Sequence, residues 1–99
     1  MTFQHISIEE AKVLIDSEEV TLVDVRDASA HGSAHIPKSV NISDANVEEF
    51  VASADKSKPM IVYCYGGNMS QGAADYFFNQ GYETVYSMDG GFEAWRQKY

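Results

Sequence analysis

Two short runs along the chain are almost continuously apolar. Residues 20–25 read VTLVDV, and residues 60–63 read MIVY. Runs of this length without polar alternation are typical of strands that are buried on both faces of a sheet. Residues 40–42 and 84–86 are shorter runs of strand-forming residues. The pattern therefore predicts four strands that are distributed along the whole chain.

The segments between these strands have the apolar spacing of amphipathic helices. We predict helices over residues 8–15, 44–54, 70–80 and 92–98. Ser7 and Glu10 have the S-x-x-E spacing of a capping box, which marks the start of the first helix. Asp44 is expected to cap the second helix, and Gly81 to end the third. Residues 29–34 are expected to be irregular or a single helical turn.

Strands that alternate with helices indicate an α/β protein built on a central parallel β-sheet. Right-handed crossover connections would place the helices on both faces of that sheet. The chain has 99 residues, so we expect residues 1–99 to form a single domain. In sheets of this kind, binding and catalytic sites form beyond the carboxyl ends of the strands.

The charge and hydropathy of the chain exclude several classes of function. The formal net charge is -8, which argues against nucleic-acid binding because phosphate contacts need clustered Lys and Arg. An acidic surface favours solubility, and we expect a monomer or a weak dimer. No apolar run is long enough to span a membrane, so we expect no membrane association.

The N-terminal residues and the cysteine count indicate the compartment. The opening sequence MTFQHISIEEAK lacks the basic and apolar regions of a signal peptide. A single cysteine excludes an internal disulfide and fits a reducing environment. We therefore expect a cytoplasmic protein.

The single cysteine, Cys64, comes directly after the second apolar strand, in the segment CYGGNMS. Gly66 and Gly67 would let the backbone curl so that several N–H groups point toward one centre. A helix that begins near Ser70 adds partial positive charge at the same place. A thiol there is expected to be a thiolate near neutral pH. The alternative is a buried structural cysteine, but these three features together favour a nucleophile.

The segment CYGGNMS resembles the active-site loop of the rhodanese family. Two other segments resemble the family in the same order and at the same spacing. They are residues 21–42, TLVDVRDASAHGSAHIPKSVNI, and residues 81–95, GYETVYSMDGGFEAW. Together with the chain length, they are most similar to the short single-domain thiosulfate sulfurtransferases of the GlpE type. The resemblance implies a rhodanese-like domain over essentially the whole chain.

The resemblance also implies a thiosulfate sulfurtransferase with Cys64 as its catalytic nucleophile. Cys64 would take the outer sulfur of a donor such as thiosulfate, hold it as a persulfide, and pass it to a thiophilic acceptor. The implied acceptor is cyanide in vitro, a thiol, or a thioredoxin-like protein. No metal or organic cofactor is implied. The implied substrate-binding residues, whose backbone N–H groups would hold the persulfide, are Tyr65, Gly66, Gly67, Asn68, Met69 and Ser70.

Other polar residues are expected to have structural roles. Asp24 and Arg26 follow the first apolar strand, and the resemblance implies that they tie this strand to neighbouring loops. The resemblance implies that His35 packs and forms hydrogen bonds, and sulfur transfer from a thiolate needs no general base. His5, His31 and His35 share no metal-ligand spacing, so no metal site is predicted.

The loop departs from the family pattern in its charge. Many members carry Arg or another basic residue in this loop, whereas residues 65–70 are uncharged here. In an acidic protein this weakens the recognition of an anionic donor. Lys38 is a candidate for a cation on the loop side. Tyr65, beside the nucleophile, is expected to line the mouth of the pocket.

Two other functions are weighed against the enzyme. A non-catalytic or weakly active rhodanese-like module that carries sulfur or binds a partner would fit the uncharged loop. A cysteine-dependent phosphatase or arsenate reductase would need a C-x5-R loop whose Arg clamps the oxyanion. The residue six positions after Cys64 is Ser70, which argues against that class.

Overall fold

The computed structural model of the protein describes residues 2–99. Within them, a five-stranded sheet contains β1 (Gln4–Ile6), β2 (Thr21–Asp24), β3 (Val40–Asn41), β4 (Met60–Tyr63) and β5 (Val85–Met88). The strands are all parallel and lie in the order β1-β5-β4-β2-β3. The helices are α1 (Ile8–Ser17), α2 (Ala28–Ser33), α3 (Val47–Ser53), α4 (Met69–Asn79) and α5 (Gly91–Lys98). The predicted α/β class with a central parallel sheet is confirmed.

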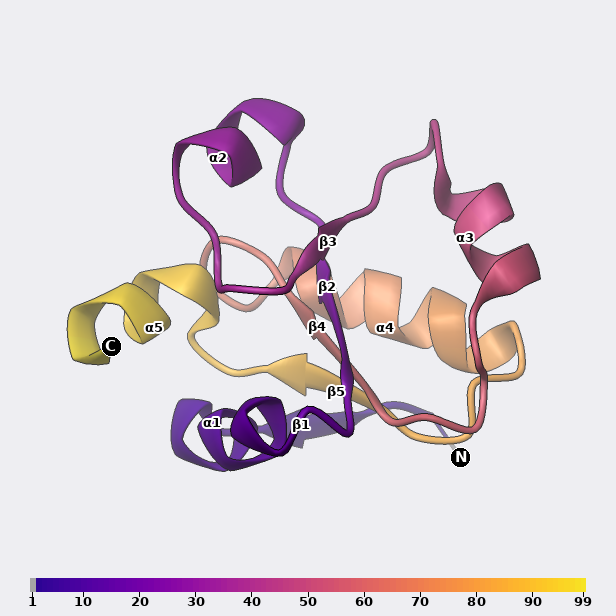
Figure 1. Cartoon of the computed structure of the whole chain (residues 1–99), viewed down its shortest axis with the longest axis horizontal. Coiled ribbons are helices and arrows are strands. Elements are labelled where there is room, and N and C mark those ends of the chain that lie inside the picture. Colours follow the sequence, from indigo (N-terminus) through magenta and orange to yellow (C-terminus); the bar gives the residue numbers. More distant parts are fainter. Residues whose placement is uncertain (1) are drawn as a thin grey trace.

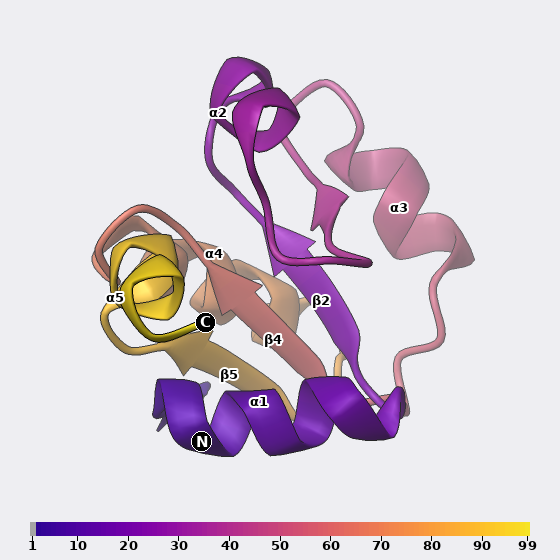
Figure 2. The same cartoon turned by 60° about the vertical axis from the view of Figure 1, so that its left-hand side comes forward.

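Helices cover both faces of the sheet (Figures 1 and 2). The side chains of β4 alternate between two hydrophobic clusters. Ile61 and Tyr63 pack with residues of α1 and α5, whereas Met60 and Val62 pack with residues of α3 and α4. All four side chains are fully buried. A strand covered on both faces needs apolar residues at every position, which explains why residues 60–63 form the most apolar run of the sequence.

The central strands end side by side at one edge of the sheet. Asp24 at the end of β2 pairs in register with Tyr63 at the end of β4, and Val62 pairs with Ser87 of β5. The next residue after β4 is Cys64, so it lies at this carboxyl edge. The short helix α2 lies just beyond the end of β2 (Figure 1). The edge where the sequence predicts a site is therefore framed by the loops that follow β2, β4 and β5.

The predicted capping box at the first helix is confirmed, but the predicted cap of the α3 helix is wrong. The Glu10 N–H donates to the Ser7 hydroxyl at 3.1 Å, and the Glu10 carboxylate accepts from the Ser7 backbone. Helix α3 begins at Val47, after a turn in which the Val47 N–H donates to the Ser43 carbonyl. The N-cap residue is Asn46, whose side chain accepts from the Ser43 N–H instead of capping the helix. This turn moves the N-cap by two residues, from the predicted Asp44 to Asn46.

Three other elements differ from the pattern-based prediction. Strand β1 was not predicted, because only Ile6 among its three residues is buried and the strand is defined by backbone pairing with β5. Residues 28–33 form a helix without apolar spacing, which begins where the Asp27 carboxylate accepts the Ala30 N–H at 2.9 Å. Strand β5 extends to Met88, beyond the predicted end at residue 86.

In residues 2–99, no helix combines the length and the hydropathy needed to cross a bilayer.

Candidate active site

Cys64 lies directly after β4, and its side chain is 1% exposed. The backbone N–H groups of Gly67 and Ser70 both donate to its Sγ atom, at 3.2 Å each. The Ser70 hydroxyl lies 3.4 Å from the same sulfur. A negative charge on Sγ is therefore stabilised by dipoles of the loop and of the first turn of α4.

The loop is held in this conformation by the start of α5. The Phe92 N–H donates to the Cys64 carbonyl at 2.8 Å, and the Glu93 N–H donates to the Tyr65 carbonyl at 3.0 Å. Gly91 makes this approach possible, since a Cβ atom there would lie 2.6 Å from the Tyr65 carbonyl oxygen. Because N–H groups of α5 bind these two carbonyl groups, the carbonyls point toward α5, and N–H groups of the loop can point toward the sulfur.

The two glycines of the loop are not equivalent. Gly67 has a φ of +101°, and a Cβ atom there would lie 3.0 Å from the Gly90 nitrogen. Gly66 has no positive φ, and a Cβ atom there would meet nothing within 4 Å. The prediction that both glycines shape the loop is thus confirmed for Gly67 and wrong for Gly66.

Behind the cysteine lies a serine that sequence reasoning missed. The Ser70 and Ser87 hydroxyl oxygens are 2.8 Å apart, and both side chains are buried. Ser87 shares its face of β5 with Val85, which belongs to the core packed against α4. A serine at an inward-facing position of an apolar strand was the available signal.

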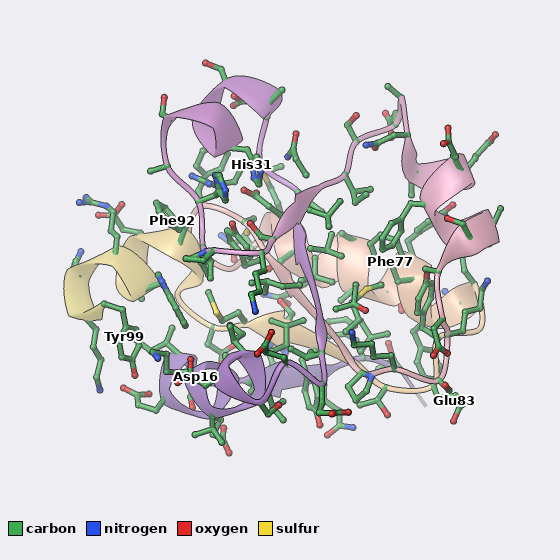
Figure 3. The ribbon with its side chains drawn as sticks, viewed as in Figure 1. Asp16, His31, Phe77, Glu83, Phe92 and Tyr99 are labelled. Carbon is green, nitrogen blue, oxygen red and sulfur yellow. The ribbon has the colours of Figure 1, made fainter. Side chains whose placement is uncertain are left out.

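Asp24 is the centre of a buried polar network beside the site. It accepts hydrogen bonds from the Arg26 guanidinium, from the Tyr63 hydroxyl at 3.0 Å and from His31 Nδ1 at 2.8 Å. Burial raises the pKa of Asp24, but the hydrogen bonds from Arg26 and His31 outweigh it and hold the pKa below the ordinary value. Figure 3 shows His31 on the side of α2 that faces the sheet. The network joins β2, α2 and β4 without a recorded hydrogen bond to Cys64.

Arg26 extends this network to a cleft at the active-site loop. Its guanidinium carbon lies 4.2 Å from the centre of the Phe92 ring and 5.9 Å from that of the Tyr65 ring. The cleft has a volume of about 490 Å³. Its lining residues are Arg26, Ala30, Ser33, Ala34, Tyr65, Gly66, Phe92, Glu93 and Arg96. Both cations in this lining are paired with carboxylates, Arg26 with Asp24 and Arg96 with Glu93.

The exposed part of the loop is formed by Tyr65, Gly66, Asn68 and Met69. Tyr65 lines the cleft, and its hydroxyl donates to the Asp27 carboxylate at the start of α2. Asn68 precedes α4 and makes no side-chain cap to it. Cys64 itself is buried, so these four residues form the surface of the loop.

Met69 lies on another side of the loop, at a groove between α3 and α4. Its side chain is 56% exposed, and the groove has a volume of about 740 Å³. The lining of this groove includes three carboxylates, Asp27, Asp44 and Glu48, and one cation, Arg26, which is paired with Asp24. Lys38 does not supply the cation suggested by the sequence, because its ammonium group pairs with Glu18 at the end of α1. The structure thus keeps this side of the loop acidic.

The histidines do not contact the cysteine sulfur. His31 binds Asp24, His35 Nδ1 lies 2.7 Å from the His31 carbonyl oxygen, and the two imidazole rings stack at 3.9 Å. His5 pairs with Asp89 at 2.9 Å. Among residues 2–99, no group of three His, Cys, Asp or Glu side chains is arranged to hold a metal ion. The hydrogen bonds recorded for Cys64 Sγ in this part of the chain involve only the loop backbone and Ser70.

The fold and the site together define an α/β protein that presents a cysteine on a loop of inward-facing backbone donors. The chain belongs to the Rhodanese-like domain family, whose match covers residues 7–98. This assignment confirms the resemblance seen in the three sequence segments.

Similar proteins match the chain over nearly its full length. It is 46% identical to thiosulfate sulfurtransferase GlpE of Pseudoalteromonas translucida, over 100% of this chain and 94% of that protein. It is 50% identical to thiosulfate sulfurtransferase GlpE of Pseudomonas savastanoi pv. phaseolicola, over 98% of this chain and 91% of that protein. The similarity therefore includes the loop and all of the elements that frame it.

Solved structures confirm the fold. The rhodanese-like domain of the Anabaena protein Alr3790 has a TM-score of 0.84 at 25% identity, covering 95% of this chain and 74% of that chain. The human single-domain sulfurtransferase TSTD1 has a TM-score of 0.86 and covers 96% of both chains. At 19% identity, the human protein is evidence for the fold alone.

Proposed function

We propose that this protein is a thiosulfate sulfurtransferase that carries sulfur as a persulfide on Cys64. The observation that carries the proposal is the buried Cys64 sulfur, which accepts the N–H groups of Gly67 and Ser70 at the carboxyl edge of the sheet. The full-length similarity to the GlpE enzymes supports the same reaction. The protein is an enzyme of the sulfurtransferase class, with a sulfur donor and a thiophilic acceptor as its substrates.

The reaction takes place in two steps. The Cys64 thiolate attacks the outer sulfur of thiosulfate, the S–S bond of the donor breaks, and its electron pair leaves with sulfite. The charge balances, because a monoanion and a dianion give a persulfide monoanion and a sulfite dianion. The acceptor then attacks the outer sulfur of the persulfide, and Sγ leaves as a thiolate. With cyanide the product is thiocyanate, and no general base is needed.

We propose that residues 65–70 bind the substrate through their backbone. Gly67 and Ser70 hold the inner sulfur, and the exposed residues Tyr65, Gly66, Asn68 and Met69 surround the position of the outer sulfur. Thiosulfate then binds mainly to N–H dipoles, since the nearest cations of the cleft, Arg26 and Arg96, are paired with carboxylates. Asp24 and Arg26 stabilise the scaffold of this site.

The finer assignments are also proposals. Residues 1–99 act as one catalytic domain, which exists as a monomer or a weak dimer. The acidic surface supports this state because like charges repel. The single thiol supports work in a reducing compartment, the cytoplasm, where a thioredoxin-like protein serves as a sulfur acceptor.

The test is steady-state turnover of the purified protein with thiosulfate and cyanide, followed by thiocyanate formation. Mass spectrometry after thiosulfate alone should find one added sulfur atom, and Cys64→Ser should abolish both signals while circular dichroism stays unchanged. A folded wild-type protein without turnover would contradict the enzyme. If it still acquired the sulfur, the result would instead support a sulfur-carrier module, which the uncharged loop and the acidic groove favour.

A further inference from the structure

Two buried serine hydroxyls form a hydrogen-bonded chain that ends at the Cys64 sulfur. The Ser70 Oγ atom is 3.4 Å from Sγ on one side and 2.8 Å from Ser87 Oγ on the other. The three side chains are at most 1% exposed, so bulk water does not compete for their hydrogen bonds. In the described part of the chain, Ser70 is the one hydrogen-bond partner recorded for the Ser87 hydroxyl.

The thiol and the thiolate forms of Cys64 differ in how many hydrogen-bonding protons the three side chains share. With a thiol, the S–H group donates to Ser70, Ser70 donates to Ser87, and the Ser87 proton is left without a recorded acceptor. With a thiolate, Ser87 donates to Ser70, Ser70 donates to the sulfur, and both hydroxyl protons are used. Buried polar groups strongly favour arrangements in which every donor has a partner. The pair is therefore organised for an anion at Sγ.

We propose that Ser87 is a positioning residue that directs the Ser70 proton toward the Cys64 sulfur. A hydroxyl that accepts one hydrogen bond becomes a better donor in the next, so the Ser87 bond strengthens the Ser70 bond to a thiolate. Within the sulfurtransferase reaction, on which this second consequence rests, Sγ is an anion twice. It is the attacking thiolate of the first step and the leaving group of the second. Ser87 thus assists both steps without touching either substrate.

The primary test is the rate of alkylation by iodoacetamide as a function of pH. Cys64 is the only cysteine, so the rate reports this sulfur alone and does not depend on sulfurtransferase activity. Ser87→Ala should move the midpoint of the profile to higher pH and, at pH values below the wild-type midpoint, slow alkylation about two- to tenfold, the range of one net hydrogen bond. Ser70→Ala should have at least as large an effect. Ser87→Thr, which keeps a hydroxyl, should restore the wild-type midpoint.

The double variant separates positioning from packing. If Ser87 acts through Ser70, Ser87→Ala should change nothing further in the Ser70→Ala background. An unchanged midpoint in folded Ser87→Ala, or an equal shift in both backgrounds, would overturn the proposal. Should Ser87→Ala not fold, Ser87→Cys fills the same volume, and mass spectrometry distinguishes alkylation at Cys64 from alkylation at position 87. Turnover by the same variants should fall by a similar factor. If the alkylation midpoints shift as expected but the protein shows no turnover, the result contradicts the proposed enzyme and not the role of Ser87.

Discussion

Single residues of the loop have unequal tasks, as the pair Gly66 and Gly67 shows. The sequence presents two identical neighbours, so their spacing alone gives no reason to distinguish them. The structure does so, because the positive φ and the close Gly90 nitrogen belong to Gly67 alone. Cys64 could be selected from its place after a strand. The inward-facing position of Ser87 was a local signal that it is buried, but its partner Ser70 on α4 is known only from the structure.

The two glycines form a matched pair for mutation. Gly67→Ala forces an L-residue into a strained backbone conformation and should lower the free energy of unfolding by about 1–3 kcal/mol. It also displaces an N–H donor of the sulfur, so turnover should fall by at least about tenfold. Gly66→Ala should change the unfolding free energy by no more than about 0.5 kcal/mol. Urea unfolding and turnover measure both effects, and equal losses in the two variants would contradict the assignment.

Met69 offers a site at which charge can be added without disturbing the core. Its side chain is 56% exposed, so it does not point into the core. Met69→Arg should lower the Michaelis constant for thiosulfate about two- to fivefold, since a nearby cation attracts the dianion by roughly 1 kcal/mol. The catalytic constant should change less, because donor and transition state carry the same charge.

Met69→Gln is the control for this change, since it alters polarity without adding charge. It should leave the Michaelis constant near the wild-type value. A folded Met69→Arg protein with an unchanged or higher constant would mean that loop charge does not limit donor binding.

At the scale of elements, a strand or helix was predictable from the sequence where its burial requires a regular pattern of apolar residues. β2, β4, α1 and α4 were recognised because each has one or two faces against the core. β1 was missed, and α2 was expected only as irregular chain or a single helical turn, because backbone pairing and an Asp27 cap define these elements and apolar spacing does not. Asp44 failed as a predicted cap because Ser43 and Asn46 form a competing turn.

The Asp24 network joins three of these elements, and its contribution to stability should depend on pH. The pKa of Asp24 is held below its ordinary value in the folded protein, so the carboxylate stabilises the fold above the unfolded-state pKa of about 3.9. This stabilisation is lost as the pH falls below that value and through the folded-state pKa. Asp24→Asn leaves the buried Arg26 without its partner and should cost about 3–5 kcal/mol at pH 7.

Urea unfolding at a series of pH values tests this prediction. The difference between wild type and Asp24→Asn should be constant above about pH 5 and should narrow below about pH 4. A difference that does not vary with pH would contradict the ionic role. Turnover per folded molecule should fall by no more than about twofold, because Asp24 has no recorded contact with Cys64; a large loss at unchanged stability would instead show a catalytic role.

At the scale of the whole molecule, the net charge of -8 opposes the approach of an anionic donor. The repulsion acts over the Debye length, which falls from about 30 Å at 0.01 M salt to about 8 Å at 0.15 M. With thiosulfate, kcat/KM should therefore rise about two- to fivefold over this range, the opposite of what an attractive, cationic site would give. Local recognition by backbone dipoles is much less affected, because those donors lie within a few ångströms of the sulfur.

Two alkylating reagents of nearly the same shape test the electrostatic repulsion without relying on the sulfurtransferase reaction. Iodoacetate is an anion and iodoacetamide is neutral, and both react with the single thiol of Cys64. The iodoacetate rate should rise with salt by about the square root of the factor for kcat/KM, because iodoacetate carries one negative charge and thiosulfate two, whereas the iodoacetamide rate should stay nearly constant. If both rates followed the salt concentration, the cause would be a change in the loop and not repulsion. If neither alkylation rate changed with salt, the attraction of an anion to the N–H groups of the loop would offset its repulsion by the surface charge. The net charge would then not limit which donor the protein uses.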